Sequence, residues 1–511
     1  MPATARPEDD ARRRLVVVGS GMAATRLVEE LVARDAQRHL AITVLGDEPV
    51  APYNRILLSA VLAGTHRREA LVLRDAAWFA RNDVDLRVGA RVLGVDRGHR
   101  DVMLVDGTLV PYDLLVLATG SIPTLPPIRG LVRMDGSLHE AVHAFRSLAD
   151  CERLLAAVDD AGRAVVVGGG LLGLQVARAL GLRGITTEVV EGADHLLHRQ
   201  LDTAAGRVLA RDLARLGVAV YTGARAVRLS DAAPASIGGA LRVPDPLPER
   251  PGRAALRLDN GHVLDTDLVV LTAGGRPATA LARGAGLQVR RGVVVDERLA
   301  SVSDPDIHAI GDCAQYGERI PGLVPPAWEQ AGVLARVLCG EAARYDGSRV
   351  VARLRATDLD VAVLGEPASE IERGGEVVEV SNPIARSHRR LVVREGRIVA
   401  ATLVGDLSRV GLITQAFDRG TVLAPDEPGR LLLPEHAVAD ADLRGGAVAA
   451  LPDEAEVCAC AGVSAGRVRS CASLDDARET TRATTGCGGC TPTVRALLAS
   501  RPALATSPKG A

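Results

Sequence analysis

Two stretches of the chain share one pattern, in which an unbroken apolar run ends in a glycine-rich turn and gives way to helical spacing of apolar residues. The first is LVVVGSGMAATRLVEELVAR (15–34), followed by a second apolar run, LAITVLGDE (40–48). The pattern returns as AVVVGGGLLGLQVARALGLRG (164–184), followed by TTEVVEG (186–192). Apolar runs without alternation are typical of strands buried on both faces of a parallel sheet. The pattern therefore predicts an α/β fold with two doubly wound lobes.

Three further apolar runs end in tight turns and extend these lobes: YDLLVLATGSIP (112–123), DLVVLTAGGRP (267–277) and DIHAIGDCAQY (306–316). Residues 230–252 are rich in Pro, Gly and Ala, so we expect a surface loop within a β-meander there.

The pattern changes near residue 347. Strand-like runs and a helical run over 347–435 predict a small mixed α+β domain, and residues 436–456 lack aromatic side chains and periodicity, as a linker does. A cysteine-rich module occupies 457–500. We therefore expect a first lobe in two segments, 13–150 and 268–346, on either side of a second lobe at 151–267.

Charge and hydropathy exclude two classes of function. The 511 residues include 61 Lys and Arg against 63 Asp and Glu, and this near-neutral balance argues against nucleic acid as a partner. No apolar run reaches the roughly 20 residues of a membrane helix. We therefore expect a cytoplasmic protein that binds neither nucleic acid nor membrane.

The first glycine-rich turn, GSGMAA, lies between a predicted strand and a predicted helix, as a dinucleotide-binding turn must. Gly19 permits the tight turn, Gly21 lets the backbone approach a pyrophosphate, and Ala24 lets the helix pack close to the strand. The acidic pair Asp47 and Glu48 ends the next strand, where a carboxylate accepts hydrogen bonds from ribose hydroxyls.

The second turn repeats the motif with Gly168, Gly170 and Gly173, and Glu191 closes the following strand. A carboxylate at this position favours the free 2′-hydroxyl of NADH and repels the 2′-phosphate of NADPH. The alternative for Glu191 is a solvated residue at a strand end. Three downstream side chains attract phosphate and leave some NADPH binding open: His195, His198 and Arg199.

The two turns in this order, with ATGSIP between them and IGDCA after them, resemble the two-dinucleotide-binding flavoproteins of the glutathione-reductase-like fold over about residues 13–345. The resemblance implies two Rossmann-like lobes, with FAD on the first and NADH on the second. It also implies that four turn residues lie beside FAD, namely Thr119, Gly120, Gly311 and Asp312.

Two motifs narrow this resemblance. EPVAPYNRILLSAVLAG lacks the CxxxxC redox pair of the glutathione-reductase branch, and with PPAWEQAG it is similar to the ferredoxin-reductase and nitrite-reductase branch. In that branch the arginine of PYxR, here Arg55, sits beside the cofactor and the tryptophan, here Trp328, approaches the flavin ring. The alternatives are a surface ion pair for Arg55 and core packing for Trp328.

Five of the eight cysteines crowd into the last part of the chain, which in a long cytosolic protein points to a metal centre. Cys458 and Cys460 form CxC, Cys487 and Cys490 form CxxC, and 26 residues separate the two pairs. Four thiolates suit either tetrahedral zinc or a [2Fe–2S] cluster, and spacing alone leaves both open.

The residues around these cysteines, VCACAGVSAGRV and TRATTGCGGCTPTV, resemble the small helical [2Fe–2S] domain of the bacterioferritin-associated-ferredoxin type. The resemblance implies that all four cysteines ligate iron. The spacer is shorter than is usual for that family, so we expect a shortened helix–loop–helix. We interpret Cys471 in the spacer, and Cys313 beside Asp312, as small buried residues.

Over about residues 14–495 the whole arrangement resembles the electron-transfer flavoproteins of bacterial assimilatory nitrite and nitrate reduction. The resemblance implies that NADH passes a hydride to FAD and that electrons leave singly through the [2Fe–2S] cluster. The acceptor it implies is a nitrate or nitrite reductase catalytic subunit. No sirohaem or molybdopterin module is visible in the sequence, so we expect the chain to hand its electrons on, and we assign no catalytic side chain.

Other functions stay open. One is a ferredoxin- or rubredoxin-type reductase or an NADH oxidase with a structural zinc site, and another is a redox-sensing binding protein. The sequence also leaves open whether the protein forms a homodimer.

Overall fold

The protein, as a computed structural model, is described over residues 12–231, 253–348, 351–355, 360–433, 451–458, 461–485 and 490–500. Contacts within the chain divide it into two units, Met1–Leu432 and Leu433–Ala511. Nearly all of the loop predicted at 230–252 and most of the linker predicted at 436–456 lie outside the described residues. Within those residues, no helix has the length and apolar character needed to cross a membrane.

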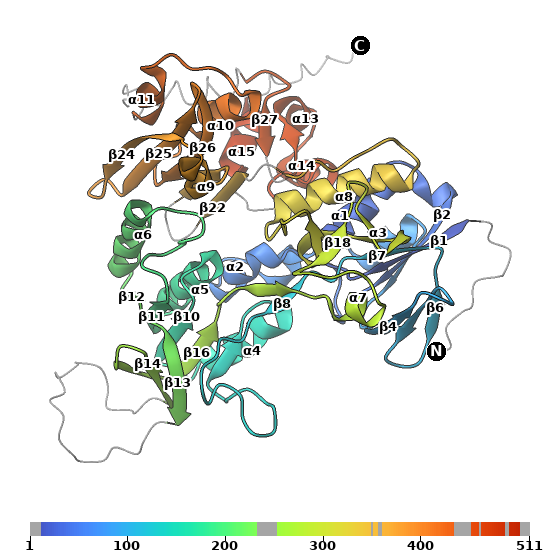
Figure 1. The fold of residues 1–511 in the computed structure, drawn as a ribbon, viewed down its shortest axis with the longest axis horizontal. Helices are drawn as coiled ribbons and strands as arrows, with labels where there is room; N and C mark the ends of the chain where they lie inside the picture. The colour runs from blue at the N-terminus through green and yellow to red at the C-terminus, as the bar shows by residue number, and fades with distance from the viewer. Residues whose placement is uncertain are drawn as a thin grey trace, which may run out of the picture. The chain divides into compact units, whose positions relative to one another are not determined.

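The first lobe is built on one large sheet, in which the described residues form eight strands in the order β21-β18-β19-β20-β7-β1-β2-β3. Figure 1 labels β18, β7, β1 and β2 of this sheet. Its strands β20, β7, β1, β2 and β3 pair in parallel. The strands are β1 (Arg13–Val18), β2 (Leu40–Leu45), β3 (Val84–Arg87), β7 (Leu114–Leu117), β18 (Val293–Val295), β19 (Ala300–Ser301), β20 (Asp304–Ala309) and β21 (Ala314–Tyr316). The helices are α1 (Met22–Val32), η1 (Ala36–Arg38), η2 (Arg55–Leu57), α2 (Leu58–Leu62), η3 (Arg68–Leu71), α3 (Ala76–Arg81), α7 (Ala280–Gly284), η4 (Gly311–Cys313) and α8 (Val324–Leu338).

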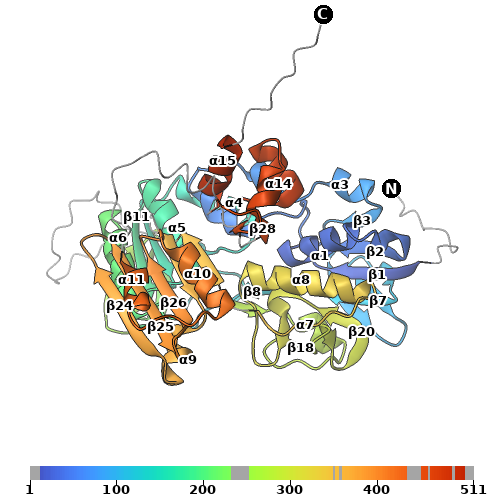
Figure 2. The ribbon, with the colours of Figure 1, turned by 90° about the horizontal axis from the view of Figure 1, so that it is seen from above.

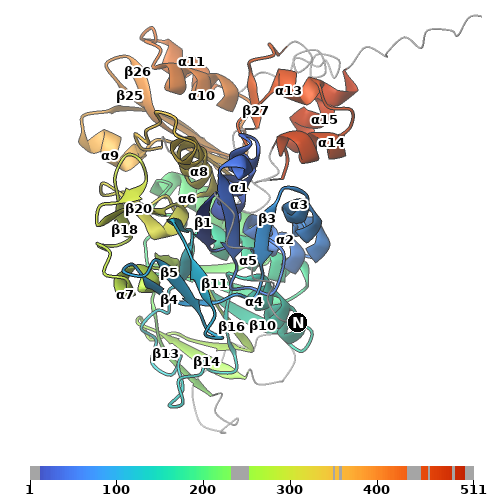
Figure 3. The same ribbon diagram turned by 90° about the vertical axis from the view of Figure 1, so that its right-hand side faces the viewer.

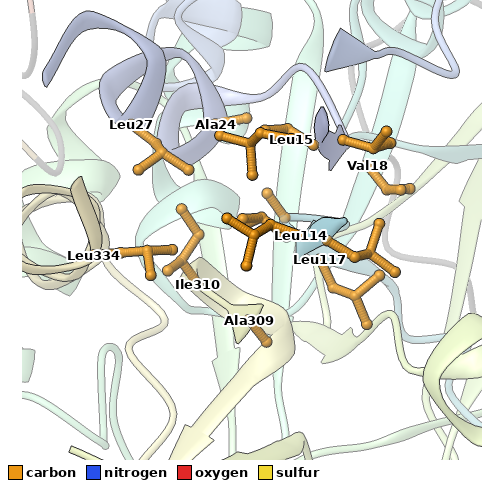
Figure 4. Close-up of a cluster of buried hydrophobic side chains, with 14 of the residues drawn as sticks. Leu15, Val18, Ala24, Leu27, Leu114, Leu117, Ala309, Ile310 and Leu334 are labelled. Carbon is orange, nitrogen blue, oxygen red and sulfur yellow. The ribbon is translucent and has the colours of Figure 1, made fainter. Parts of the chain in front are cut away.

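The core of this lobe lies between the sheet and two helices that lie side by side, α1 and α8 (Figure 2). Figure 4 shows Leu15 of β1, Leu27 of α1 and Leu334 of α8 converging on the same buried cluster, and each is fully buried. Because α8 comes from the end of the lobe's second segment, the cluster joins two segments that are far apart in the sequence.

The second lobe contains five described strands in the order β12-β11-β10-β16-β9, and every pairing between neighbours is parallel. The strands are β9 (Val142–Ala144), β10 (Arg163–Val167), β11 (Thr186–Glu191), β12 (Ala219–Thr222) and β16 (Leu268–Leu271). The helices are α4 (Leu148–Val158), α5 (Leu171–Leu182) and α6 (Thr203–Arg215). Two parallel, doubly wound lobes confirm the predicted α/β class.

Smaller antiparallel sheets accompany the lobes. Each lobe carries a three-stranded meander, and the short pair β8 and β17 lies where the chain crosses between the lobes. These strands are β4 (Val92–Asp96), β5 (Asp101–Leu104), β6 (Leu109–Pro111), β8 (Ser121–Pro123), β13 (Ala226–Asp231), β14 (Ala254–Leu258), β15 (Val263–Thr266) and β17 (Gly275–Pro277).

A small antiparallel domain follows, with the described strand order β22-β23-β26-β25-β24. Figure 3 shows α10 and α11 beside this sheet, and both helices contact its strands. The elements are β22 (Val351–Arg355), β23 (Asp360–Leu364), α9 (Pro367–Glu372), β24 (Glu376–Asn382), β25 (Ser387–Arg394), β26 (Arg397–Val404), α10 (Val410–Arg419) and α11 (Glu427–Leu432).

The second unit is a small helical module around a compact apolar core, to which Val463, Val468, Val494 and Leu497 each contribute a fully buried side chain. A short helix, a loop and a second helix occupy the stretch between the two cysteine pairs, as the short spacer predicted. The described elements are β27 (Glu456–Cys458), β28 (Val463–Ser464), α13 (Ala465–Arg469), α14 (Leu474–Thr481) and α15 (Thr491–Ala499).

Leu27→Ala tests the packing of α1 on the first sheet. Removing a fully buried leucine leaves a cavity, which typically costs about 2–5 kcal/mol, so we expect the melting temperature to fall by roughly 5–15 °C. The control is Leu93→Ala on β4, where the side chain is 60% exposed and the expected fall is less than about 2 °C. Equal falls in thermal unfolding of the two variants would contradict this account of the core.

Candidate functional site

The first glycine turn is shaped by the end of a neighbouring strand. Gly19 has a φ of +111°, and a Cβ at this position would lie 2.3 Å from the carbonyl oxygen of Ala118, just after β7. The Gly19 N–H donates to the carbonyl oxygen of Leu45 at the end of β2, at 2.8 Å. Only glycine fits this position, because the turn is held between the ends of two strands.

Gly21 is glycine for a different reason. It is the N-cap of α1 in an extended conformation, and a Cβ at this position would meet no protein atom within 4 Å. The first N–H groups of a helix lack intrahelical acceptors and attract phosphate. Ala24, one turn later, is fully buried against the sheet. This turn therefore offers open space beside a helix N-terminus, which fits a dinucleotide pyrophosphate.

The two acidic residues at the end of β2 take different positions. The Asp47 side chain is 68% exposed, 3.9 Å from Arg91, whereas Glu48 faces the glycine turn. Glu48 accepts a hydrogen bond from the Tyr53 hydroxyl at 2.7 Å and forms an ion pair with Arg55. A hollow beside the turn is lined by Ser20, Gly21, Glu48, Val50, Ala51, Pro52, Tyr53 and Arg55.

The polar groups around Glu48 hold each other in place. Burial raises the pKa of Tyr53 well above its ordinary value, against a smaller lowering by Arg55. The Tyr53 hydroxyl therefore stays protonated and donates a hydrogen bond to Glu48. The Arg55 guanidinium lies 5.2 Å from the Tyr53 ring centroid and also donates to the carbonyl oxygen of Arg146. Arg55 thus forms the ion pair named as its alternative, but beside the glycine turn.

Asp312 comes to the same region from the second segment of the first lobe, just after β20. Its Oδ2 accepts hydrogen bonds from Ser121 Oγ at 2.8 Å and from the Arg146 guanidinium at 3.1 Å. Sequence reasoning named neither Ser121, although it directly follows the predicted pair Thr119 and Gly120 in ATGSIP, nor Arg146, which lies in no recognised motif. The signal that could have found both is their position where the chain crosses between the lobes.

Gly311, before Asp312, has a φ of +73°, and its N–H donates to Gln330 Oε1 at 2.8 Å. Thr119 and Gly120 are both hydrogen-bonded to Ala278, the residue after β17. Thr119 Oγ1 donates to the Ala278 carbonyl oxygen, and the Ala278 N–H donates to the Gly120 carbonyl oxygen. The four turn residues predicted beside FAD are thus brought near one another from the ends of β7 and β20.

Trp328 is buried on α8, with 7% of its surface exposed. The Arg26 guanidinium of α1 lies 5.7 Å from its ring centroid, and its indole N–H has no hydrogen-bond acceptor among the described residues. This is the packed position named as the alternative for Trp328. Its neighbour Gln330 is the residue of the Trp-Glu-Gln stretch that supports the Gly311 turn.

The second glycine turn repeats the constraint seen in the first. Gly168 has a φ of +119°, and a Cβ there would lie 2.7 Å from the Thr272 carbonyl oxygen after β16. A Cβ at position 173 would lie 1.9 Å from the Gly168 carbonyl oxygen, so Gly173 allows the close approach of helix and turn. Gly170 is the N-cap of α5 and, like Gly21, has no protein atom within 4 Å of a Cβ position.

Glu191 is held against this second turn. It is 9% exposed, and its carboxylate accepts from the Gly169 N–H at 2.7 Å and from the Ala193 N–H at 2.8 Å. The alternative of a solvated residue at a strand end is therefore wrong. His198 Nδ1 lies 3.7 Å from Glu191, whereas His195 is bound to Asp194 and to the Leu201 carbonyl oxygen. Arg199 is exposed.

The structure describes two of the four cysteines that were predicted to hold the metal centre. Cys458 is buried at the end of β27, and Cys490 is the N-cap of α15. Cys460 and Cys487 lie outside the described residues, and the described part of the chain contains no group of three or more His, Cys, Asp or Glu side chains arranged to hold a metal.

The remaining cysteines near these sites are packed residues. Cys471 is buried, and its thiol donates to the Arg467 carbonyl oxygen at 3.1 Å. Cys313 donates to the carbonyl oxygens of Leu117 and Ile310, and burial raises the pKa of its thiol. A thiol whose pKa is raised by burial is a poor nucleophile, which agrees with the predicted structural role of Cys313.

Comparison with known proteins agrees with this geometry. Residues 13–331 match the pyridine nucleotide-disulphide oxidoreductase family, and residues 456–500 match the BFD-like [2Fe-2S] binding domain. The chain is 34% identical to nitrite reductase [NAD(P)H] of Bacillus subtilis (strain 168) over 95% of its own length and 57% of the relative. It is 28% identical to the assimilatory nitrate reductase electron transfer subunit of the same organism, over 95% and 59%. The chain thus spans little more than half the length of these curated relatives.

Among solved structures, the fold is similar to that of the ferredoxin reductase for the CYP199A2 system from Rhodopseudomonas palustris. The TM-score is 0.65 at 27% identity, over 77% of this chain and 91% of that one. The predicted likeness to two-dinucleotide flavoproteins and to a [2Fe–2S] domain is confirmed at the level of the families. The chain belongs to the pyridine nucleotide-disulphide oxidoreductase family and carries a BFD-like [2Fe-2S] domain after its flavoprotein lobes.

Proposed function

We propose that this protein takes electrons from NADH and hands them, one at a time, to the catalytic subunit of an assimilatory nitrate or nitrite reductase. The observation that carries the proposal is the presence in one chain of two open, glycine-capped helix N-termini, at Gly21 and Gly170, and a [2Fe-2S] domain. Bound FAD would supply the conversion of a two-electron hydride transfer into one-electron steps, and a [2Fe–2S] cluster would supply a one-electron relay.

The first turn is proposed to hold FAD. The α1 N-terminus at Gly21 faces the pyrophosphate, and the Glu48 carboxylate, held by Tyr53 and Arg55, accepts from ribose hydroxyls. Arg146 and Ser121 orient the Asp312 carboxylate toward the polyol hydroxyls of the cofactor. The proposed FAD-binding residues are Gly19, Gly21, Ala24, Asp47, Glu48, Arg55, Thr119, Gly120, Gly311, Asp312 and Trp328.

The second turn is proposed to hold NADH. Gly168, Gly170 and Gly173 bring the backbone to the pyrophosphate, and Glu191 accepts from the adenosine ribose hydroxyls. Because two backbone N–H groups hold the Glu191 carboxylate at the turn, a 2′-phosphate would meet a negative charge that cannot swing away. This fixed charge supports a preference for NADH over NADPH.

The four cysteines are proposed to ligate one [2Fe–2S] cluster. Cys458 and Cys490 lie on either side of the spacer that folds into α13 and α14. We further propose the domain boundaries expected from the sequence, with an FAD lobe at 13–150 and 268–346, an NADH lobe at 151–267, a small domain at 347–435, a linker at 436–456 and the cluster domain at 457–500.

The nitrogen-assimilation partner is proposed from the names of the relatives. One is a nitrite reductase and another an electron transfer subunit of assimilatory nitrate reductase. A second candidate function, reductase of a ferredoxin-type protein, is favoured by the likeness to the R. palustris ferredoxin reductase over 91% of that chain.

An anaerobic NADH titration tests the proposed electron path. We expect flavin absorbance to bleach and the low-temperature electron paramagnetic resonance signal of a [2Fe–2S] cluster to appear in the same titration. Cys490→Ser removes a proposed ligand, so iron and acid-labile sulfide should fall severalfold while flavin bleaching persists. The control is Cys471→Ser in the same module, and this variant should keep the iron content of the unaltered protein. Zinc in place of iron in the unaltered protein would contradict the path and favour a simple flavin reductase.

Alanine at Gly21 and at Gly170 separates the two nucleotide sites. Neither added methyl group meets a protein atom, so the FAD-free forms of both variants should melt within about 2 °C of the FAD-free unaltered protein. The methyl group instead occupies the space proposed for a pyrophosphate. We expect Gly21→Ala to purify with several times less FAD, and Gly170→Ala to keep its FAD while its KM for NADH rises about tenfold or more. A result in which both variants retain full FAD content and KM would overturn the assignment of both turns.

Glu191→Gln tests the origin of the coenzyme preference. Glutamine keeps a hydrogen-bond acceptor but removes the charge, so we expect the NADH-to-NADPH ratio of kcat/KM to fall at least about tenfold. Glu188→Gln, three residues earlier on β11, is the matched control because its carboxylate accepts from the Tyr221 hydroxyl at 3.0 Å. An unchanged ratio in Glu191→Gln would show that the carboxylate does not set the preference.

A further inference from the structure

The small domain contacts the second lobe through buried polar groups on β25. Side chains alternate along this strand, so that His388 and Arg390 face α6 of the second lobe, whereas Arg389 points the other way, to the Leu432 carbonyl oxygen. His388 is fully buried and donates from Nε2 to Asp202 Oδ2 at 3.1 Å. Arg390 reaches the same oxygen at 3.2 Å.

Asp202 is the N-cap of α6, and its carboxylate has two tasks. Oδ1 accepts from the Ala205 N–H at 3.0 Å, which caps the helix, while Oδ2 accepts from the small domain. Burial raises the pKa of Asp202, but hydrogen bonds from His388, Ala205 and Arg390 outweigh it and hold that pKa well below its usual range. The carboxylate is therefore charged, and it joins helix and small domain.

The far end of α6 is held by the residue just before the same strand. Asp212 on α6 has 3% of its side chain exposed and forms an ion pair with Arg386, directly before β25. Apolar packing follows the same face, because Val361, Val363 and Val404 of the small domain belong to the buried cluster of the second lobe. A buried carboxylate is costly unless it is paired, so both ends of α6 depend on the small domain.

Asp202 also ends the segment that closes over the second glycine turn. From Glu191, whose carboxylate accepts from Gly169, the chain runs to Leu197, whose N–H donates to the Gly169 carbonyl oxygen at 2.9 Å. His195 Nε2 lies 2.9 Å from the Leu201 carbonyl oxygen, one residue before Asp202. The segment 191–202 thus contacts the second glycine turn through Glu191 and Leu197, and its last residue, Asp202, contacts the small domain.

We propose that Asp202, His388 and Arg390 are positioning residues for coenzyme binding, through which the small domain holds segment 191–202 against the second glycine turn. The inference rests on the proposed function, in which that turn binds NADH. The small domain then contributes to NADH affinity without touching the coenzyme. By linkage, a bound coenzyme strengthens the contact between α6 and β25.

The test uses the full-length protein and two variants, Arg390→Gln and Asp202→Asn. Asparagine still caps a helix, so Asp202→Asn keeps α6 intact while it removes the charge. Binding of ADP-ribose, the part of NADH that reaches the glycine turn, is measured by calorimetry. We expect its Kd to rise about five- to tenfold in each variant, and in the double variant no further than in Asp202→Asn, since that single change already removes the charge that Arg390 contacts. The KM for NADH should rise by a similar factor, with kcat toward ferricyanide within about twofold of the unaltered value.

Arg394→Gln is the matched control. Arg394 lies on the same strand and pairs with a carboxylate, Glu370, but that partner belongs to the small domain itself. This variant should leave the Kd for ADP-ribose unchanged, and thermal unfolding shows whether each variant keeps its fold. An unchanged Kd in Arg390→Gln and Asp202→Asn would overturn the inference and leave the proposed function standing. If the unaltered protein binds no ADP-ribose, the proposed NADH site fails, and this inference fails with it.

Discussion

In both lobes a backbone carbonyl oxygen occupies the place where the turn between strand and helix would carry a side chain. Ala118 does this at Gly19, and Thr272 does it at Gly168. Each carbonyl belongs to the end of a strand adjacent to the one that enters the turn, so the constraint arises from parallel pairing. It brings the first turn of α1 and of α5 to the carboxyl ends of the strands, with their unpaired N–H groups facing outward. Every other group of the two sites is arranged around this geometry.

The two turns differ in how their polar support is assembled. At the second turn the support is local, because only α5 and β11 lie between Gly169 and the end of the strand at Glu191. At the first turn, Asp312 is oriented by Ser121 and Arg146, and Gln330 supports Gly311. The contact between Ser121 and Asp312 alone joins residues 191 positions apart in the sequence. The first site therefore forms only once the chain has returned from the second lobe to complete the first.

The return of the chain also gives the small domain its influence. One face of the small-domain sheet packs against the helices α10 and α11. The opposite face packs Val361, Val363 and Val404 against the second lobe. Burial on that face makes Asp202 and Asp212 dependent on partners from β25 and from Arg386 just before it, because an unpaired carboxylate at such a site would be strongly unfavourable. The helix α6 thereby joins the small domain to the segment that follows the second glycine turn.

Local pattern by itself determined the two lobes, their glycine turns, Glu191, the small domain and the cysteine module, because apolar periodicity and glycine spacing act over a few residues. It identified Asp47 and Glu48 as a pair, but only tertiary packing decided that Glu48 faces the turn while Asp47 points to solvent. The same holds for Trp328, which is buried between α1 and α8, and for Gln330, which supports the Gly311 turn. Ser121, Arg146 and the Asp202 cluster escaped prediction altogether. Their roles depend on contacts between segments that are distant in the sequence, and such contacts produce no repeating pattern of residues along the chain.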